Sequence, residues 1–358
     1  MKLKIFLRLF GVIAIILTIF PYISTNEWYV RIFDFPHLQL TLLTMIALLT
    51  YFIGFDIKSK TDYIFVVVLS GCFLFQGYKI FPYTAFAKFE AHDASPNNTK
   101  DLSIYTANVL QKNEDKQSLL SDIRANDADV LLFTETNKEW IRSLSTELDK
   151  HYEYKVEVPL DNTYGMLLFS KLKLHEPQVR YMIEDTIPSI HSQLILNSKD
   201  TIQLFAIHPA PPTPQHNPSS VDRDAEMMKI AKHSRDSELP VIVLGDFNDV
   251  AWSETTELFQ KVSGLLDMRK GRGLYSTYNA KSWVMRWPLD HVFTSADFRI
   301  KKVYRGASIG SDHFPFYAEL TYEPELAKEQ VLPPPSKEQL KKAYEQIEEG
   351  QEKKNEKN

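Results

Sequence analysis

Polar side chains that can bind a metal ion or a phosphate follow the apolar, strand-like segments of this 358-residue chain. The clearest case is VIVLGDFND, residues 241–249, in which a β-branched apolar run leads through Gly245 to Asp246 and Asn248. Because side chains alternate along an extended chain, this carboxylate and this carboxamide point the same way. Asp and Asn are also ordinary turn residues at strand ends, so this stretch alone leaves both interpretations open.

The same arrangement recurs along the chain. Side chains suited to metal or phosphate binding end, interrupt or directly precede apolar strands at Asn108, Glu135, His208, Asp246, Asn248, Asp290, His291, Asp312 and His313. Each of them alone is more often a turn residue or a satisfied polar group of a core. Their repetition at the ends of successive strands predicts an exposed cleft at one edge of a sheet.

The oxygen-bearing side chains of this set suit a hard divalent cation. Glu135 and Asp312 offer carboxylate ligands of the kind that Mg²⁺ or Mn²⁺ prefers. Asn108 and Asn248 can orient a water molecule or a phosphate oxygen without adding negative charge near an anionic substrate. The single cysteine, Cys72, lies within an apolar run, which excludes a cysteine-based metal site and a disulfide within the chain.

The histidines add acid-base capacity. His208 and His313 can donate to phosphate oxygens or move a proton, and a carboxylate partner would set the tautomer of either ring. The combined set fits metal-assisted attack of water on phosphorus. The sequence contains neither the Gly-rich phosphate loop of nucleoside triphosphatases nor a Gly-x-Ser-x-Gly elbow.

Alternating segments over residues 101–323 must position these side chains. Amphipathic helices are expected at 114–126, 137–149 and 221–234, the second with Trp140, Leu144 and Leu148 on one face. Apolar strands are expected in LSIYTANV, ADVLLFTET, YGMLLFSK, HSQLILN, TIQLFAIHP, VIVLGDF, PLDHVFTS and PFYAELTY. Several consecutive strands have no helix between them, which favours a mixed sheet system over a simple doubly wound sheet.

Residues 101–323 resemble the endonuclease/exonuclease/phosphatase superfamily, which includes pancreatic-type deoxyribonuclease. The resemblance rests on TANV, LLFTET, YGMLLFSK, LFAIHPAPP, VLGDFND, PLDHVFTS and GSDHFPF, which span the whole domain. It implies an α/β (α+β) fold, a four-layered α/β sandwich of two packed mixed sheets flanked by helices. It also implies a metal-dependent hydrolase acting on phosphoester bonds, with Mg²⁺ or Mn²⁺ bound at Asn108, Glu135 and Asp312.

The resemblance further implies catalytic roles for five residues. Asp246 corresponds to the carboxylate that activates the nucleophilic water or protonates the leaving group. Asn248 and His208 correspond to phosphate-binding groups. His313, supported by Asp290, corresponds to a pair used for acid-base work or for stabilising the transition state. No member of the family's set is missing, which disfavours a non-enzymatic binding module.

Three long apolar runs precede the domain, at about residues 5–20, 38–55 and 63–81. Each approaches the ~20 residues that cross a bilayer, and Tyr and Phe cluster near their ends. The first run alone would also fit a signal peptide, but three in succession predict three transmembrane helices in an anchor over residues 1–90. Residues 91–100 then form a polar linker. The three spans and the HPAPP turn resemble bacterial membrane-anchored members of the superfamily.

Basic residues predict the orientation of the anchor. They gather before the first run and between the second and third, at Lys2, Lys4, Arg8, Lys58 and Lys60. The loop between the first two runs holds only Arg31, although Lys79 and Lys88 follow the third. The positive-inside rule therefore places the N-terminus in the cytoplasm and the domain on the outer face of the cytoplasmic membrane.

Charge and tethering bear on the substrate. Residues 101–323 contain 25 basic and 32 acidic residues, a net charge of −7, and no run resembles a nucleic-acid footprint. RKGRG, residues 269–273, is the one short basic patch and is expected to be a solvated loop. A lipid-linked phosphate or pyrophosphate is therefore favoured. The alternative is an extracytoplasmic endonuclease, exonuclease or nucleotide phosphodiesterase acting on nucleic acid or nucleotides.

Two further pairs and the C-terminal tail leave alternatives open. Arg286 and Trp287 can contact a phosphate or a lipid head group at the rim of the cleft, or be a surface cation and a core indole. Arg223 and Asp224 can be simple surface residues. Residues 324–358 form a charged tail, expected to be disordered or marginally helical, with a weak capping box at Ser336 and a thin stripe at Leu340, Tyr344 and Ile347. A partner-binding helix is the other interpretation of the tail, and the oligomeric state has no signal in the sequence.

Overall fold

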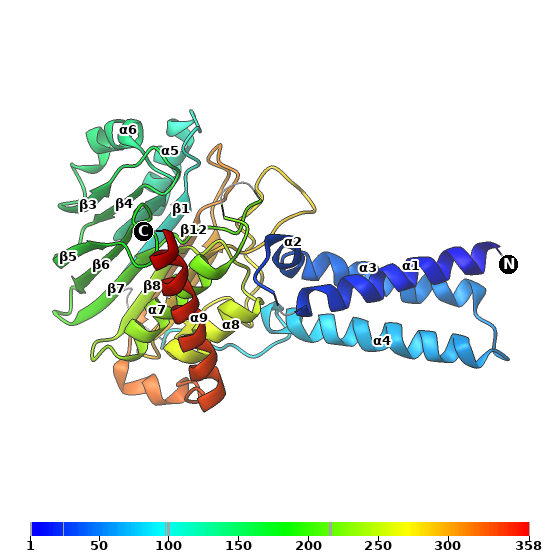
Figure 1. Ribbon diagram of the computed structural model, residues 1–358. Helices are drawn as coiled ribbons and strands as arrows, with labels where there is room; N and C mark the ends of the chain where they lie inside the picture. The colour runs from blue at the N-terminus through cyan, green and yellow to red at the C-terminus, as the bar shows by residue number, and fades with distance from the viewer. Residues whose placement is uncertain (1, 24, 97, 99–100, 215–216, 358) are drawn as a thin grey trace.

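The computed structural model describes residues 2–23, 25–96, 98, 101–214 and 217–357, and shows a bundle of helices extending from an α/β domain (Figure 1). The long helices of the bundle are α1 (Lys2–Ile19), α3 (His37–Tyr51) and α4 (Lys60–Ile80). They belong to three segments that are long and apolar enough to cross a membrane, Lys2–Tyr22, His37–Gly54 and Lys60–Tyr83. The three expected apolar helices are thus confirmed.

Small and polar side chains join the three helices of the bundle. Ala14, Ala47 and Leu69 pack where the helices meet, and the hydroxyl of Thr44 lies 3.3 Å from Oε1 of Gln76. At the end of the bundle remote from the domain, Asp62 forms ion pairs with Lys4 at 2.5 Å and Arg8 at 2.6 Å. These pairs place the N-terminal ends of α1 and α4 together, as an odd number of crossings requires.

Two six-stranded sheets form the centre of the domain. The first has the order β11-β12-β1-β2-β4-β3 and the second β5-β6-β7-β8-β10-β9. The strands of the first sheet are β1 (Leu102–Asn108), β2 (Val130–Thr134), β3 (Tyr154–Val158), β4 (Met166–Ser170), β11 (Phe298–Arg305) and β12 (Phe316–Tyr322). Those of the second are β5 (Leu174–Arg180), β6 (Ser189–Ile195), β7 (Thr201–Ile207), β8 (Val241–Asp246), β9 (Leu266–Asp267) and β10 (Asp290–Thr294). Only β1 with β2 and β7 with β8 pair in parallel among these strands, so both sheets are mixed.

Helices cover the outer face of each sheet, which completes the four layers. Helices α5 (Lys116–Asn126) and α6 (Lys138–Leu148) lie on the first sheet, and α6 buries Trp140, Leu144 and Leu148 as its periodicity predicts. Helices α7 (Val221–Arg235) and α8 (Glu254–Ser263) lie on the second. The largest apolar cluster fills the space between the two sheets. The predicted four-layered sandwich of two packed mixed sheets is therefore confirmed.

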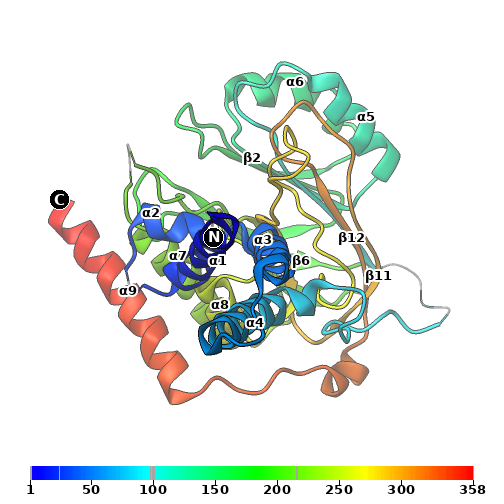
Figure 2. The same cartoon turned by 90° about the vertical axis from the view of Figure 1, so that its right-hand side faces the viewer.

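The C-terminal segment differs from the expected disordered or marginally helical tail. Helix α9 (Lys337–Lys357) packs along α7 and α8, at one edge of the domain in Figure 2. Leu340, Ala343 and Ile347 join the apolar cluster beneath α7, and Lys353 pairs with Asp222 at 2.7 Å. A helix that is weak by itself is stabilised here because its thin apolar stripe packs against α7 and α8, and the sequence alone does not reveal that packing surface.

The segment expected to be a linker is also partly packed in the described residues 91–96 and 98. Ala91 is buried, and the amide of Ala94 donates to the carbonyl of Ile300 at 2.9 Å. The hydroxyl and the amide of Ser95 both donate to the carboxylate of Glu323. Backbone pairing with the edge strand β11 thus ties the anchor to the domain, because that edge offers unpaired carbonyl and amide groups.

Candidate active site

The centre of the site is the end of β8, where Asp246 is buried. Strand β8 lies so close to β7 at Gly245 that a Cβ there would come within 1.9 Å of the carbonyl oxygen of Ile207. On the other side, β8 pairs with β10 in a register that puts Asp290 directly opposite Asp246. Strand pairing therefore brings two carboxylates from distant parts of the chain together.

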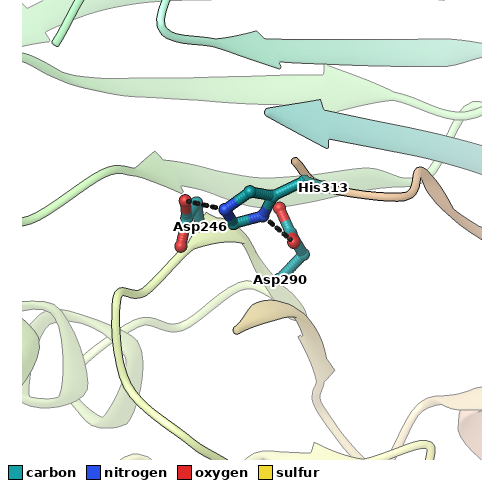
Figure 3. Close-up of side chains that lie close together, drawn as sticks. All are labelled: Asp246, Asp290 and His313. Carbon is teal, nitrogen blue, oxygen red and sulfur yellow. Dashed lines mark hydrogen bonds and ion pairs between the residues drawn. The ribbon is translucent and has the colours of Figure 1, made fainter. Parts of the chain in front are cut away.

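His313 lies between these two carboxylates (Figure 3). Its Nδ1 donates to Oδ2 of Asp290 at 2.8 Å, and its Nε2 lies 3.7 Å from Oδ2 of Asp246. Burial opposes a charge on the ring, but the carboxylates of Asp290 and Asp246 outweigh it and raise the pKa of His313 to about 10. The two carboxylates thus favour the protonated ring, whose N–H groups can donate to an anionic group.

Asn108 and Glu135 connect the first sheet to this centre. Nδ2 of Asn108 donates to Oε1 of Glu135 at 2.8 Å and to Oδ2 of Asp246 at 2.9 Å. Glu135 follows β2, the parallel neighbour of β1, and has a left-handed backbone with φ 59°. A non-glycine residue in that region indicates local strain that the surrounding contacts must hold, a feature common at functional sites.

His208 and Asn248 lie on the other side of Asp246. Nε2 of His208 is 3.9 Å from Oδ2 of Asp246, and its buried Nδ1 has no hydrogen-bond partner among the described residues. The backbone amide of Asn248 donates to Oδ1 of Asp246 at 2.9 Å, and its side-chain amide donates to the carbonyl of Pro209 at 3.0 Å. The loop after β8 is thereby held against the end of β7.

Whether this site suits a cation is decided by its charge and its donor atoms. Asp312, Asp246 and Glu135 all act on the ring of Tyr278, whose pKa is raised by burial and then by these three charges. No lysine or arginine forms an ion pair with any of the three carboxylates within the described part of the chain. Carboxylate oxygens that no basic side chain pairs with are donors of the kind that suits Mg²⁺ or Mn²⁺.

A second group, Asp246, Asp290 and His313, also offers ligand atoms within 4.8 Å of one another. Its geometry favours another role. Nδ1 of His313 already donates to Oδ2 of Asp290, so one nitrogen and one oxygen of this group are engaged in a hydrogen bond with each other. In this structure the second group is therefore a hydrogen-bonded array of one imidazole and two carboxylates.

Several residues differ from their sequence-based interpretation. Asp246 and His313 were expected to line an exposed cleft, yet they are 0 % and 4 % exposed. Tyr278 lies over His313 with ring centroids 5.0 Å apart, and Tyr164 lies 5.3 Å from the ring of His208. Aromatic rings thus cover the site. Neither tyrosine follows an apolar strand end in the manner of the other site residues, so the sequence pattern did not single them out.

Arg223 and Asp224 are buried rather than being surface residues. Arg223 is 1 % exposed, pairs with Asp224 at 2.8 Å and with Asp249 at 3.3 Å, and donates to the carbonyl of Asn248 at 3.0 Å. Its hydrogen bond to Asn248 and its ion pair with Asp249 therefore fix the loop that follows β8. The sequence did not reveal this role, because an arginine within a polar helix is ordinarily a surface residue.

The basic patch at residues 269–273 is packed into the fold rather than being a solvated loop. Arg269 is buried and pairs with Asp267 at 2.9 Å, and it also contacts His291. Strand alternation turns His291 away from the site, so its Nε2 meets the carbonyl of Asp249 instead at 2.9 Å. Arg272 pairs with Asp93. These basic groups are used within the fold.

The eight predicted residues thus lie around one centre where the two sheets meet. The family model described as Endonuclease/Exonuclease/phosphatase family matches residues 105–313, which include all eight.

The chain belongs to the endonuclease/exonuclease/phosphatase family.

Solved structures of similar fold agree with this membership. The D. rerio TDP2 complexed with single strand DNA product has 17% sequence identity and a TM-score of 0.53, and the match covers 62% of this chain and 100% of that one. A functionally unknown conserved protein from Enterococcus faecalis V583 has 17% identity and a TM-score of 0.51 over the same shares. An endonuclease/exonuclease/phosphatase from Beutenbergia cavernae has 14% identity, a TM-score of 0.50, and coverage of 63% and 72%. These likenesses show the fold.

The comparison with curated proteins found no match to this chain. Its family and fold support a hydrolase that acts on phosphoester bonds.

Proposed function

We propose that this chain is a membrane-anchored, divalent-cation-dependent hydrolase that cuts a phosphoester or pyrophosphate bond of a lipid-linked substrate at the outer face of the cytoplasmic membrane. One series of contacts carries the proposal. Tyr278 lies over His313 and stacks on Trp287, with ring centroids 6.1 Å apart. Trp287 in turn donates to Oε1 of Gln39, the third residue of α3, at 3.4 Å. The reacting centre is therefore close to the end of an apolar helix.

The hydrolysis follows from the groups around Asp246. The oxygen of a water molecule bonds to phosphorus, the ester or anhydride oxygen leaves, and the carboxylate of Asp246 accepts the proton that water releases. The His313 imidazolium, held by Asp290, donates to a phosphate oxygen as negative charge builds up on it. The leaving oxygen takes its proton from solvent. A cation bound at Glu135, Asp312 and Asn108 would supply Lewis-acid stabilisation of that charge.

Two side-chain amides and the ring of His208 complete the site without adding negative charge near the anionic substrate. Asn108 and Asn248 are held by their own hydrogen bonds, so their amides are fixed before substrate arrives. His208 has a free, buried Nδ1 within the described residues and can accept or donate once the ring is oriented. Rigid strands carry all three, which limits the reorganisation needed at the moment of reaction.

The outer-face orientation is supported by the far end of the bundle. Lys4 and Arg8 lie there beside Lys60, the first residue of α4, and the ion pairs with Asp62 hold the two helix ends together. Basic residues thus gather at the end remote from the domain. Under the positive-inside rule that end is cytoplasmic, since acidic residues contribute little to the rule.

The full chain in detergent micelles with Mg²⁺ or Mn²⁺ tests the function. Its substrates would be a lipid monophosphate, a lipid diphosphate, nucleotides and plasmid DNA, with Asp246→Asn as the inactive control. We expect release of phosphate from a lipid substrate and little action on DNA. If the chain hydrolysed only nucleotides or DNA, and the Asp246→Asn variant lost that activity, the hydrolase would be supported and the lipid substrate would be refuted.

A further inference from the structure

A loop before β10 ends in an exposed apolar tip that the catalytic groups do not use. Trp283 is 91 % exposed, Val284 70 % and Met285 44 %. Three consecutive large apolar side chains in water form a patch of the kind that marks a binding surface. In Figure 1 this loop lies on the side of the domain from which the helix bundle extends.

The loop is tied to the outer end of a membrane-spanning segment. Nε2 of Gln39 donates to the carbonyl of Val284 at 2.7 Å, and Oε1 of the same side chain accepts from the indole of Trp287 at 3.4 Å. Gln39 lies near the start of the segment His37–Gly54. The loop that carries Trp283 is thus held at the end of this segment, and an indole is favoured at a bilayer surface because one part of it is apolar and another polar.

A groove beside this loop contains two arginines. It has a volume of about 530 Å³, and its lining includes Leu38, Gln39, Trp283, Val284, Arg286 and Arg305. Both guanidinium groups lie against the ring of Phe314, Arg305 at 4.1 Å from the ring centroid and Arg286 at 5.0 Å. One wall of the groove is therefore the end of α3, and another wall is strongly cationic.

The two arginines are paired with backbone carbonyls in the part of the chain that the structure describes. Within the described residues neither guanidinium forms an ion pair, and each donates instead to a backbone carbonyl, Arg305 to Ser276 at 3.1 Å and Arg286 to Ser282. Burial, and then the charge of Arg286, lower the pKa of Arg305. Two adjacent guanidinium groups with spare donors form a site for a phosphate, which each can bind in a bidentate manner.

The pair also lies next to the reacting centre, since Phe314 directly follows His313. The amide of Phe314 donates to the carbonyl of Thr277 at 2.8 Å, and Tyr278, the next residue, covers the ring of His313. A phosphate bound against Phe314 would therefore lie close to the ring of His313. Only residues of the paired segments 277–278 and 313–314 lie between them.

We propose that Arg286 and Arg305 bind a phosphate group of a membrane lipid, which enters the groove from the bilayer while Trp283, Val284 and Met285 are inserted in the bilayer interface. The inference rests on the proposed function, because the lipid bound here is the substrate or carries it. It adds the residues that select a lipid over a soluble phosphate ester. Arg286 and Arg305 confer the phosphate specificity, and the apolar tip confers access from the membrane.

Binding can be measured without turnover. The full chain is placed in phosphatidylcholine nanodiscs with excess chelator, and tryptophan fluorescence is read with a minor fraction of brominated phosphatidic acid or of brominated phosphatidylcholine. We expect stronger quenching by the brominated phosphatidic acid, and loss of that excess in Trp283→Phe, which identifies the reporter. The Arg286→Gln/Arg305→Gln variant should weaken the phosphatidic acid effect roughly tenfold or more in lipid concentration, the scale of a lost charge-assisted hydrogen bond. Lys281→Gln, an exposed cation of the same loop, should retain it.

Equal quenching by the two brominated lipids, or an excess that survives in the double arginine variant, would overturn the inference. Circular dichroism of each variant shows whether the fold is intact, and Arg286→Lys/Arg305→Lys retains the charge where the glutamine pair does not fold. Failure of the proposed function has a different signature, because these binding measurements need no hydrolysis.

Kinetics then separate a lipid source from a soluble one. For any lipid phosphate that the chain hydrolyses, the double arginine variant should raise KM roughly tenfold with kcat nearly kept, because the pair binds the substrate without touching the reacting atoms. Inhibition by free nucleoside diphosphate that is lost in the same variant, with no effect on lipid binding, would assign the pair to soluble phosphates and refute the lipid site.

Discussion

Nδ1 of His313 donates to Oδ2 of Asp290 at 2.8 Å, and this buried hydrogen bond sets the direction in which the imidazole faces. The other ring nitrogen is thereby directed at Asp246, 3.7 Å away. Asp290 itself lies behind the ring, and its second oxygen is buried without a partner in the described part of the chain. It is a positioning residue, while His313 and Asp246 face the reacting atoms.

Asp290→Asn should therefore lower kcat by roughly 10²-fold while KM changes little, because the imidazolium loses the carboxylate that orients and charges it. Asp290→Glu should recover part of the loss. Steady-state kinetics with a substrate that the panel assay finds to be hydrolysed measure both. Asp185→Asn, which removes an exposed carboxylate paired with Lys354, should behave as the parent. A folded Asp290→Asn with normal kcat would contradict the positioning role.

Asp246 and His313 should act in one step. Asp246→Asn and His313→Ala are each expected to lower kcat by roughly 10²-fold or more, the scale of a lost acid-base group. The double variant should be far less impaired than the product of the two losses, since groups acting together are strongly non-additive. Because both side chains are buried, thermal unfolding of each variant is measured alongside. Strictly multiplicative losses would indicate that the two residues act in separate steps.

Activity should require a divalent cation held by Glu135. Excess chelator is expected to abolish turnover, and Mg²⁺ or Mn²⁺ to restore it, because the carboxylates of Glu135, Asp246 and Asp312 otherwise repel an anionic substrate. Glu135→Gln should lose most of the activity and weaken Mn²⁺ binding measured by paramagnetic resonance. Glu139→Gln, an exposed acid on the following helix, is the matched control. Full turnover in excess chelator would exclude the metal mechanism.

The domain should face away from the cytoplasm. A reporter enzyme that is active only in the cytoplasm, joined to the C-terminus after α9, is expected to remain silent, because three crossings separate the two ends of the chain. Joining the same reporter to the loop between α3 and α4 should give a signal and serves as the positive control. Reporter activity at the C-terminus would reverse the topology and remove the preference for outer-leaflet lipids.

Buried Glu226 should make stability depend on pH. This residue of α7 is 2 % exposed, its Oε1 has no hydrogen-bond partner among the described residues, and burial raises its pKa to about 8 against the opposing charge of Lys229. Between about pH 4.5 and 8 the unfolded chain loses this proton while the folded protein keeps it, so the free energy of unfolding falls as pH rises.

Glu226→Gln removes that dependence. The Tm of the variant relative to the parent should increase from about pH 5 to about pH 8, by several degrees, and level off above it. Thermal unfolding in detergent across this range measures the difference. Glu238→Gln, an exposed acid beyond the end of α7, should show no such trend. A Tm difference that is constant with pH would show that Glu226 is already ionised in the folded protein.

Much of this site could be read from local sequence. Apolar strands that end in Asn108, Glu135 and Asp246 follow simple rules of alternation and burial, and these rules also distinguish the apolar helices of the anchor from the mixed domain. The local pattern could not decide which of Asp290 and His291 faces the active site, since adjacent side chains of a strand point to opposite sides. The pairing of β10 with β8 places Asp290 opposite Asp246 and turns His291 into the core.

The remaining features depend on contacts between segments far apart in the chain. Arg286 and Arg305 converge on Phe314 from a loop and an edge strand, and Gln39 of the anchor meets the loop of Trp283. Helix α9 is weak alone and is stabilised only where α7 and α8 present a surface to it. By itself the sequence determined many of the strands and helices, the three apolar runs and the types of side chain at the strand ends, because periodicity is a local property. Only the tertiary structure decided which side chains meet, because packing energies come from partners distant along the chain.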